Sequence, residues 1–268
     1  MRYFIFVVII AIFLYLENST LSVSRYTLKS SKLKQRTVIV QVSDFHNTHI
    51  KRLKEDLWKQ IRDTDPDIIC LTGDLVDSRF TDVKCALDYV NQLAQIAPIY
   101  FVTGNHEIRL KKKPAIIRKL YNAPMTVLED EAVVLNGINL IGMDDFYDIP
   151  EDRRNHRFTD KYEQLHDDSL FNVVMLHRPE LFETYCENNV DLIICGHCHG
   201  GQIRLPLLGP GFAPNQGLFP KFSEGIYQKD GTSLIVSRGI GNSLFPFRVN
   251  NHPELVIITL QPENDVEL

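Results

Sequence analysis

The chain has little cysteine, little tryptophan and no excess of basic residues, and these shortages exclude several classes of protein. It has five cysteines and one tryptophan in 268 residues, and 29 Lys and Arg against 34 Asp and Glu give a net charge of −5. Such a chain lacks the basic surface that nucleic-acid-binding proteins carry. We therefore expect no nucleic-acid partner, and no sequence feature indicates a protein partner.

An odd number of cysteines argues against a disulfide framework. Cys70 and Cys195 lie inside apolar runs, as buried free thiols do. Cys195 and Cys198 in "CGHC" are the only closely spaced pair, so a cysteine metal site there stays open as an alternative. His197 and His199 beside this pair favour a site built on histidine instead.

The chain also lacks repeats, low-complexity segments and any break in composition after residue 36. An apolar fraction of 44% is enough for one sizeable core. We therefore predict an N-terminal anchor segment over 1–20, a linker over 21–36 and one domain over 37–262.

One long apolar run is present, and it lies at the N-terminus. Arg2 is followed by fourteen apolar or aromatic residues, Tyr3 to Leu16. As a helix this run extends about 21 Å, against roughly 30 Å for the hydrocarbon core of a bilayer. Because no small-residue cleavage site follows, we predict an uncleaved single-pass anchor in the cell membrane. The alternative is a buried N-terminal helix.

The side of the membrane on which the domain would lie is not fixed by the sequence. Free cysteines and a basic segment favour the cytoplasm. The cations of this segment are Arg25, Lys29, Lys32, Lys34 and Arg36. The very short N-terminus favours export, and the prediction leans to the extracytoplasmic side.

Apolar runs with polar endings alternate with amphipathic segments along the rest of the chain. The predicted strands lie within 37–42, 67–74, 98–107, 132–145, 172–180, 191–201, 232–239 and 253–260. The predicted helices lie within 53–61, 82–97, 114–122 and 179–188. Strands that are apolar throughout and alternate with helices indicate an α/β fold whose sheet is covered on both faces.

Side chains that bind divalent metals follow five of the predicted strands directly. They are Asp44, His46, Asp74, Asp77, Asn105, His106, His177, His197 and His199. Because sites in α/β sheets form beyond the carboxyl ends of strands, we expect these side chains on one rim. Carboxylates, an amide oxygen and imidazoles suit divalent ions of hard to intermediate character. There are more candidate ligands than the four that one tetrahedral zinc site needs, and their number suits two ions that share a carboxylate.

Taken in order, these motifs resemble those of one known family. The series "DFH", "GDLVD", "GNHE", His177 and "GHCH" is similar to the five motifs of calcineurin-like metallophosphoesterases, over roughly Val38 to His199. The strings "GHCHGGQIRLPLLG" and "SRGIGNSLFPFR" resemble a bacterial branch with membrane-anchored or exported members. The resemblance implies a two-sheet α/β sandwich with helices on both outer faces, after the N-terminal anchor.

The resemblance also implies a role for each motif residue. A first metal ion would be held by Asp44, His46 and His199. Asp74 would bridge both ions, and the second ion would be held by Asn105, His177 and His197. His106 would give a proton to the leaving oxygen or stabilise developing charge, oriented by Asp77. Phe45 and Glu107 depart from the usual leucine and aspartate, and neither change removes a ligand.

The implied activity is hydrolysis of phosphate esters by a metal-bridging hydroxide, with two divalent ions as cofactors. Manganese is favoured, with iron or zinc as alternatives. Arg178 and Arg204 lie close to motif histidines and are predicted to bind a non-reacting phosphate or nucleotide; the alternative is that they are solvated surface arginines.

Two other functions stay open. Some members of the similar branch are pyrophosphatases acting on UDP-2,3-diacylglucosamine, a nucleotide-linked lipid. The predicted anchor and the apolar loop over 204–222 favour such a substrate, although this loop can also be an irregular segment packed on the sheet. A metal-binding scaffold without catalysis is the other, and the presence of His106 argues against it.

Overall fold

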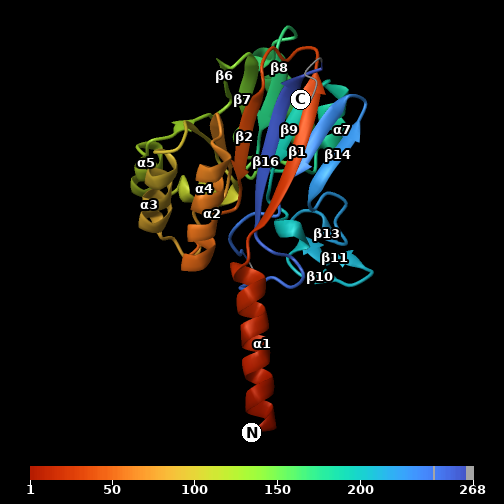
Figure 1. Cartoon of the computed structure of the whole chain (residues 1–268). Helices are drawn as coiled ribbons and strands as arrows, with labels where there is room; N and C mark the ends of the chain where they lie inside the picture. The colour runs from red at the N-terminus through yellow and green to blue at the C-terminus, as the bar shows by residue number, and fades with distance from the viewer. Residues whose placement is uncertain (244, 264–268) are drawn as a thin grey trace.

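The computed structural model describes residues 1–243 and 245–263, which form two β-sheets packed face to face with helices on both outer faces (Figure 1). The first sheet has the order β1-β16-β2-β3-β4-β5. Its strands are β1 (Ser22–Ser30), β2 (Thr37–Val42), β3 (Ile68–Thr72), β4 (Ile99–Val102), β5 (Thr126–Val127) and β16 (Glu254–Pro262). The predicted two-sheet α/β architecture is thus confirmed.

The second sheet has the order β14-β15-β9-β8-β7-β6. Its strands are β6 (Glu131–Leu135), β7 (Ile138–Gly142), β8 (Phe171–Met175), β9 (Leu192–Cys195), β14 (Gly225–Lys229) and β15 (Thr232–Val236). The helices of the chain are α1 (Arg2–Ser19), α2 (Lys51–Thr64), α3 (Val83–Leu93), α4 (Asn105–Leu110), α5 (Pro114–Tyr121), α6 (Glu151–Leu165), α7 (Phe182–Glu187) and the short 3₁₀ helix η1 (His199–Gly201).

Alternate residues of each central strand pack on opposite sides of its sheet. In β2, Val38 and Val40 contact the core beneath α2 and α3, whereas Ile39 lies in the core between the two sheets. In β8, Val173 faces the first sheet and Val174 packs with residues of α6 and α7. Because both faces are covered, the strands are apolar throughout, which explains their continuous apolar runs.

The carboxyl ends of the parallel strands meet at one rim of the sandwich. Strands β2, β3 and β4 are parallel neighbours in the first sheet, and β7, β8 and β9 are parallel neighbours in the second. The buried Gln41 amide joins the two sheets there, since its Nε2 donates to Thr72 Oγ1 at 3.1 Å and to Cys195 O at 2.8 Å. The loops after these strands therefore face one another.

The prediction of a membrane anchor, and with it of a location in the cell membrane, is wrong. Within the described ranges, no helix combines the length and the apolar character needed to cross a bilayer. Helix α1 projects from the domain (Figure 1), but its last turn is polar and is held by the domain. Asn18 Oδ1 accepts from Arg248 N at 2.9 Å, and Glu17 is buried. Only Tyr3 to Leu16 stays apolar, about 21 Å of helix against roughly 30 Å of hydrocarbon.

Three other segments differ from the sequence interpretation or add to it. Residues 22–30, within the predicted linker, form β1, which pairs in parallel with β16 from Ser22–Glu254 to Ser30–Pro262. Helix α6 has no predicted counterpart, because Phe158 and Tyr162 are its only buried side chains and the rest of its sequence is mostly polar. The loop over 204–222 forms two short ribbons, β10 (Arg204–Leu205) with β11 (Gly209–Pro210) and β12 (Phe212–Ala213) with β13 (Gly217–Leu218).

Candidate metal centre

The rim brings together all nine predicted residues that follow strands, and every one of them is buried. They come from the loops after β2, β3, β4, β8 and β9, and they are Asp44, His46, Asp74, Asp77, Asn105, His106, His177, His197 and His199. Residues far apart in the sequence thus form one cluster of polar side chains beneath the surface.

Three groups of three candidate ligands lie within this cluster: one is built on Asp44, one on Asp74, and the third consists of His46, Asp77 and His106. Asp44, His46 and His199 place their ligand atoms within 4.8 Å of one another, with Asp44 Oδ1 3.3 Å from His199 Nε2. Asp74, His177 and His197 form the second group, with Asp74 Oδ2 3.3 Å from His177 Nε2.

Asp74 lies between the two groups. Its Oδ2 atom is 3.5 Å from Nε2 of His46 in the first group and 3.3 Å from Nε2 of His177 in the second. One carboxylate oxygen therefore faces ligands on both sides, which is the position that a residue shared by two ions needs.

Backbone and hydroxyl donors fix the orientation of both carboxylates. Asp44 Oδ2 accepts from Ser43 Oγ at 2.6 Å and from His197 N at 3.0 Å. Asp74 Oδ1 accepts from His106 N at 2.8 Å. In each side chain one oxygen is held by the protein, so the other, Asp44 Oδ1 or Asp74 Oδ2, points into the centre.

Several inward-facing polar atoms have no hydrogen-bond partner among the described residues. They include Asp44 Oδ1, His46 Nε2 and Asn105 Oδ1, all buried. A buried polar atom without a partner costs about 1–3 kcal/mol, so such atoms are rare in folded proteins. All three are lone-pair donors of the kind that bind divalent ions, and the residues present therefore fit a metal centre.

Charge in the centre agrees with this interpretation. Burial alone would raise the pKa of Asp74, but the imidazole of His177 holds it well below its usual value. Burial lowers the pKa of His177, yet the carboxylates of Asp74, Asp44 and Asp145 together outweigh burial and raise this pKa to about 10. The centre thus attracts positive charge, which a divalent ion can supply in place of ring protons.

Many of the predicted ligands adopt a backbone conformation that non-glycine residues rarely take. Positive φ angles occur at Asp44 (51°), His46 (44°), Asp74 (51°), His197 (71°) and His199 (47°). Such conformations concentrate at functional sites, where the surrounding structure enforces them. The strand ends of this rim turn sharply so that the side chains face the centre.

Glycine next to the ligands allows the loops to approach closely. Gly73 has a φ of +88°, and a Cβ atom there would lie 2.5 Å from His177 Nδ1 and 2.9 Å from the Gly104 Cα. A side chain at this position would push the loops after β3, β4 and β8 apart.

Glu107 joins two of these loops. The sequence alone identifies this residue only as a departure from the aspartate usual in the family. Its carboxylate accepts from the backbone N–H groups of Asp74 at 2.8 Å, Gly104 at 2.9 Å and Val76 at 3.0 Å. Burial raises its pKa to about 7, and the nearby charge of Asp74 adds to the shift. A single glutamate thus positions the loop that carries Asp74 against the start of α4.

His106 belongs to the third group, with His46 and Asp77, and to neither of the groups built on Asp44 and Asp74. Its Nδ1 accepts from Ser78 N at 2.9 Å, so a neutral ring carries its proton on Nε2, which lies 3.9 Å from Asp74 Oδ2. Burial lowers the pKa of His106 to about 4, which keeps the ring neutral at pH 7.

Asp77 lies beside both His46 and His106. Its Oδ1 is 3.6 Å from His106 Nδ1, and its Oδ2 is 3.5 Å from His46 Nδ1. Its shortest ion pair is with Arg79, at 2.7 Å. Because Ser78 makes the hydrogen bond to His106 Nδ1, the orienting role of Asp77 stays a prediction.

The two arginines predicted to bind substrate lie in different surroundings. Arg178 is buried, pairs with Asp145 through Nε at 2.8 Å and places Nη1 3.2 Å from His197 Nε2. Arg204 pairs with Glu224 at 2.7 Å and is not among the residues that line the cleft above the centre. Arg178 therefore adjoins the ligands, whereas the role of Arg204 stays a prediction.

A cleft of about 500 Å³ opens onto the centre. Asp74, Asn105, His106, His197 and His199, all predicted site residues, line one part of it. Its other lining residues are Arg79, Arg109, Tyr147, Arg154, Arg178, Phe212, Pro214, Asn215 and Ser243. The cleft gives a substrate access to the predicted ligands and to His106.

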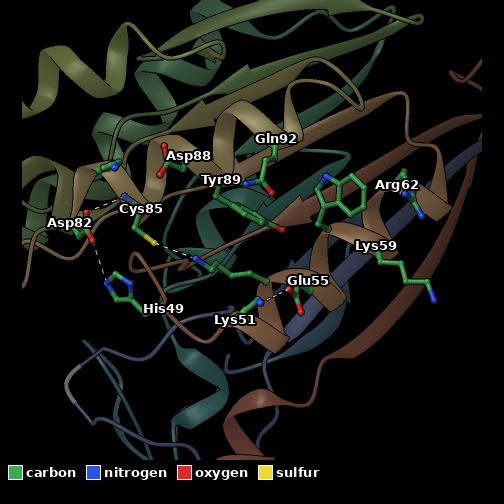
Figure 2. A pocket seen from close by; sticks show the side chains of 13 residues that line it. His49, Lys51, Glu55, Lys59, Arg62, Asp82, Cys85, Asp88, Tyr89 and Gln92 are labelled. Carbon is green, nitrogen blue, oxygen red and sulfur yellow. Dashed lines mark hydrogen bonds and ion pairs between the residues drawn. The ribbon is translucent and has the colours of Figure 1, made fainter.

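A larger cavity, about 680 Å³, lies elsewhere, between α2 and α3 (Figure 2). Trp58 and Tyr89 line it, and His49 lies 3.4 Å from Asp82 at one end. His49, Asp82 and Cys85 are close enough to hold one ion, but none of the nine predicted rim residues lines this cavity. Size alone therefore does not identify the functional site.

The cysteine alternative gains no support. All five cysteines are free, and neither Cys195 nor Cys198 belongs to a ligand group within the described part of the chain. Cys195 Sγ instead faces Ile235 O, and Cys198 Sγ accepts from Gln216 Nε2.

A two-sheet α/β sandwich that carries two ligand groups and a shared carboxylate at its rim defines a metal-dependent phosphoesterase. Residues 37–201 match the family described as "Calcineurin-like phosphoesterase", and the chain belongs to this family. The predicted family is confirmed. Membership also supports the predicted hydrolysis of phosphoester bonds, and together with the ligand groups it supports the prediction of two divalent ions. The narrower assignment to a membrane-anchored or exported branch has no such support.

Known relatives are similar over most of the chain. The "Phosphodiesterase YaeI" of Escherichia coli is 31% identical over 202 residues, which are 73% of this chain and 70% of the relative. An "Uncharacterized metallophosphoesterase" of Helicobacter pylori is 30% identical over 240 residues, or 87% of this chain, and the chain spans 62% of its length. The crystal structure of TT1561 of Thermus thermophilus shares the fold, with a TM-score of 0.50 at 11% identity over 76% of this chain and 90% of that one.

Sequence reasoning gave no role to Arg248, which the structure places beside the ligands. Its side chain is fully buried, and Nη2 lies 3.3 Å from His199 Nδ1 and donates to Gly241 O at 2.6 Å. Burial lowers its pKa to about 10. A lone arginine in a loop has no periodic pattern, so the sequence carries no signal for this contact.

Proposed function

We propose that this chain hydrolyses phosphate esters in the cleft, using two divalent ions held at the rim. The observation that carries the proposal is the position of Asp74 Oδ2, 3.5 Å from His46 and 3.3 Å from His177. Asp44, His46 and His199 would hold the first ion. Asn105, His177 and His197 would hold the second, and Asp74 would serve both.

The donor set favours certain ions. Carboxylates, an amide oxygen and imidazoles, without a thiolate, suit manganese, iron and zinc. We place manganese first because oxygen donors contribute three of the seven proposed ligands, namely Asp44, Asp74 and Asn105. When bound, such ions neutralise phosphoryl oxygens and lower the pKa of bound water.

The residues around the centre have separate tasks in this proposal. His177 donates Nδ1–H to Thr72 O at 2.8 Å, which turns its Nε2 lone pair toward Asp74 and the centre. His106 is neutral and carries its proton on Nε2 at the edge of the cleft, so it would donate a hydrogen bond that stabilises the negative charge developing on the leaving oxygen. Arg178 donates to a phosphoryl oxygen, and the ion pair with Asp145 keeps its guanidinium in place.

A pyrophosphatase acting on a nucleotide-linked lipid is the second candidate. The observation that favours it is an apolar pocket of about 240 Å³ that shares Phe212 with the cleft. Leu205, Leu218, Phe219 and Phe245 also line this pocket. An acyl chain would fit such a lining while the phosphates lie at the rim.

Release of p-nitrophenol from aryl esters tests the proposal. We expect the purified full chain to cleave p-nitrophenyl phosphate or bis(p-nitrophenyl) phosphate after addition of Mn²⁺, and a chelator to abolish the activity. Faster cleavage of the monoester would identify a phosphomonoesterase, and faster cleavage of the diester would identify a phosphodiesterase. If neither is cleaved, a UDP-linked diacylglucosamine is tested next. A protein that binds two ions yet cleaves none of the three would contradict the proposal and favour a scaffold.

A further inference from the structure

The lining of the cleft around the predicted metal ligands is rich in arginine. Arg79, Arg109, Arg154 and Arg178 all line it. Arg79 and Arg178 are paired with the carboxylates of Asp77 and Asp145, at 2.7 and 2.8 Å. Their charge is therefore largely balanced by the protein itself.

Arg109 and Arg154 have no such balance. Within residues 1–243 and 245–263, neither guanidinium lies within 4.0 Å of a carboxylate oxygen. The Arg109 guanidinium lies over the Tyr147 ring at 4.5 Å, and Arg154 Nε donates to Ile149 O at 3.1 Å. These neutral partners fix the direction of both side chains and leave several N–H donors free to meet a ligand.

Two half-buried cations in one cleft repel each other unless an anion lies between or beside them. A guanidinium presents paired N–H groups that match a phosphate, and its contacts with charged oxygens are strong. Because Arg178 Nη1 lies 3.2 Å from the proposed ligand His197, we assign Arg178 to the reacting phosphate, with the proposed ions, and not to the non-reacting phosphate expected from the sequence. Arg109 and Arg154 are thus in excess of what a single phosphate needs.

We propose that Arg109, Arg154 and Tyr147 form a subsite for a second phosphate group of the substrate. The inference rests on the proposed hydrolase function and deepens it, because it restricts the substrate to compounds with at least two phosphates. The second phosphate is either adjacent to the first, as in a diphosphate, or separated from it, as in a bisphosphate. In both cases it does not react and serves to position the substrate.

Substrates matched in all but the second phosphate test this inference. Methyl phosphate is compared with methyl diphosphate, which has adjacent phosphates; because its P–O–P bond is more reactive than an ester bond, this pair is judged by KM alone. Propyl and hexyl phosphate are compared with propanediol and hexanediol bisphosphate, which have separated ones. For the better class, we expect wild-type kcat/KM to exceed that of the matching monophosphate by at least about tenfold, mainly through KM, as expected for charge-assisted hydrogen bonds.

Variants assign this preference to the two arginines. In the double variant R109Q/R154Q we expect the preference to disappear, while kcat for the monophosphates stays within about twofold of wild type. The matched control is R153Q, because Arg153 is the exposed neighbour of Arg154 on α6 and does not line the cleft. Its preference should be unchanged. Circular dichroism melting curves check that all three proteins fold alike.

Two outcomes would overturn the subsite: a wild-type protein that shows no preference for either class, or a double variant that loses monophosphate and bisphosphate activity equally. Absence of turnover on every compound would instead count against the proposed hydrolase. In that case calorimetry with hexanediol bisphosphate and methyl diphosphate decides the subsite. Binding that is lost in R109Q/R154Q supports it, and binding that is equal in both proteins refutes it.

Discussion

Asp74→Asn is expected to remove at least one of the two ions and to lower turnover by about 10³-fold or more. Asparagine has the shape of aspartate and tolerates the φ of 51° at this position, so the backbone should not change. Because His106 N donates to Oδ1, the amide oxygen takes that place and the NH₂ group replaces Oδ2. A donor then faces both ligand groups, where an ion needs an acceptor, and several kcal/mol of metal assistance are lost.

Metal content and turnover of the purified variant are measured together. The control is Asp63→Asn, an exposed aspartate on α2, which should keep both ions and full activity. Two ions per chain in Asp74→Asn, with activity near that of wild type, would show that Asp74 does not bridge.

His106→Ala should leave metal content unchanged and lower turnover by about 10²–10³-fold, the usual effect of losing a hydrogen-bond donor to charge that develops in the transition state. Its Nε2 lies 3.9 Å from Asp74 Oδ2, and we assign it to no ion. The loss should be larger for an alkyl ester than for a p-nitrophenyl ester, because a departing alkoxide keeps more negative charge on its oxygen.

The dependence on leaving group separates a hydrogen-bond donor to the leaving oxygen from a residue that only shapes the site. His156→Ala serves as the control, since His156 is an exposed histidine on α6, and it should behave as wild type. An equal loss on both esters would argue against a contact between His106 and the leaving oxygen. Loss of an ion in His106→Ala would instead make His106 a ligand.

The parts of the site that could be predicted are those with a local sequence signal. Strand β2 has the predicted bounds, Thr37–Val42, because a strand covered on both faces is an unbroken apolar run. The ligands follow such runs directly, so their meeting at one rim needs only the rule that parallel strands end together. Asp44, Asp74 and His177 are examples: each follows the end of a strand directly, and this alone predicts that its side chain lies at the rim.

Other features depend on contacts that no local pattern records. The length of the apolar run suggested an anchor, but Asn18 ties the end of α1 to Arg248, 230 residues away. Tyr147 precedes α6 and Arg154 lies on it, a helix with only two buried side chains, whereas Arg109 lies in the last turn of α4. Their convergence in the cleft, like the three backbone contacts of Glu107, is set by tertiary structure alone.

Anomalous X-ray diffraction from crystals of the full chain grown with Mn²⁺ tests the central claim most directly. Data collected on either side of the manganese absorption edge locate the ions without reference to activity. We predict two peaks, one beside Asp44, His46 and His199 and one beside Asn105, His177 and His197, with Asp74 between them. A single peak, or peaks that do not contact Asp74, would contradict a dinuclear centre.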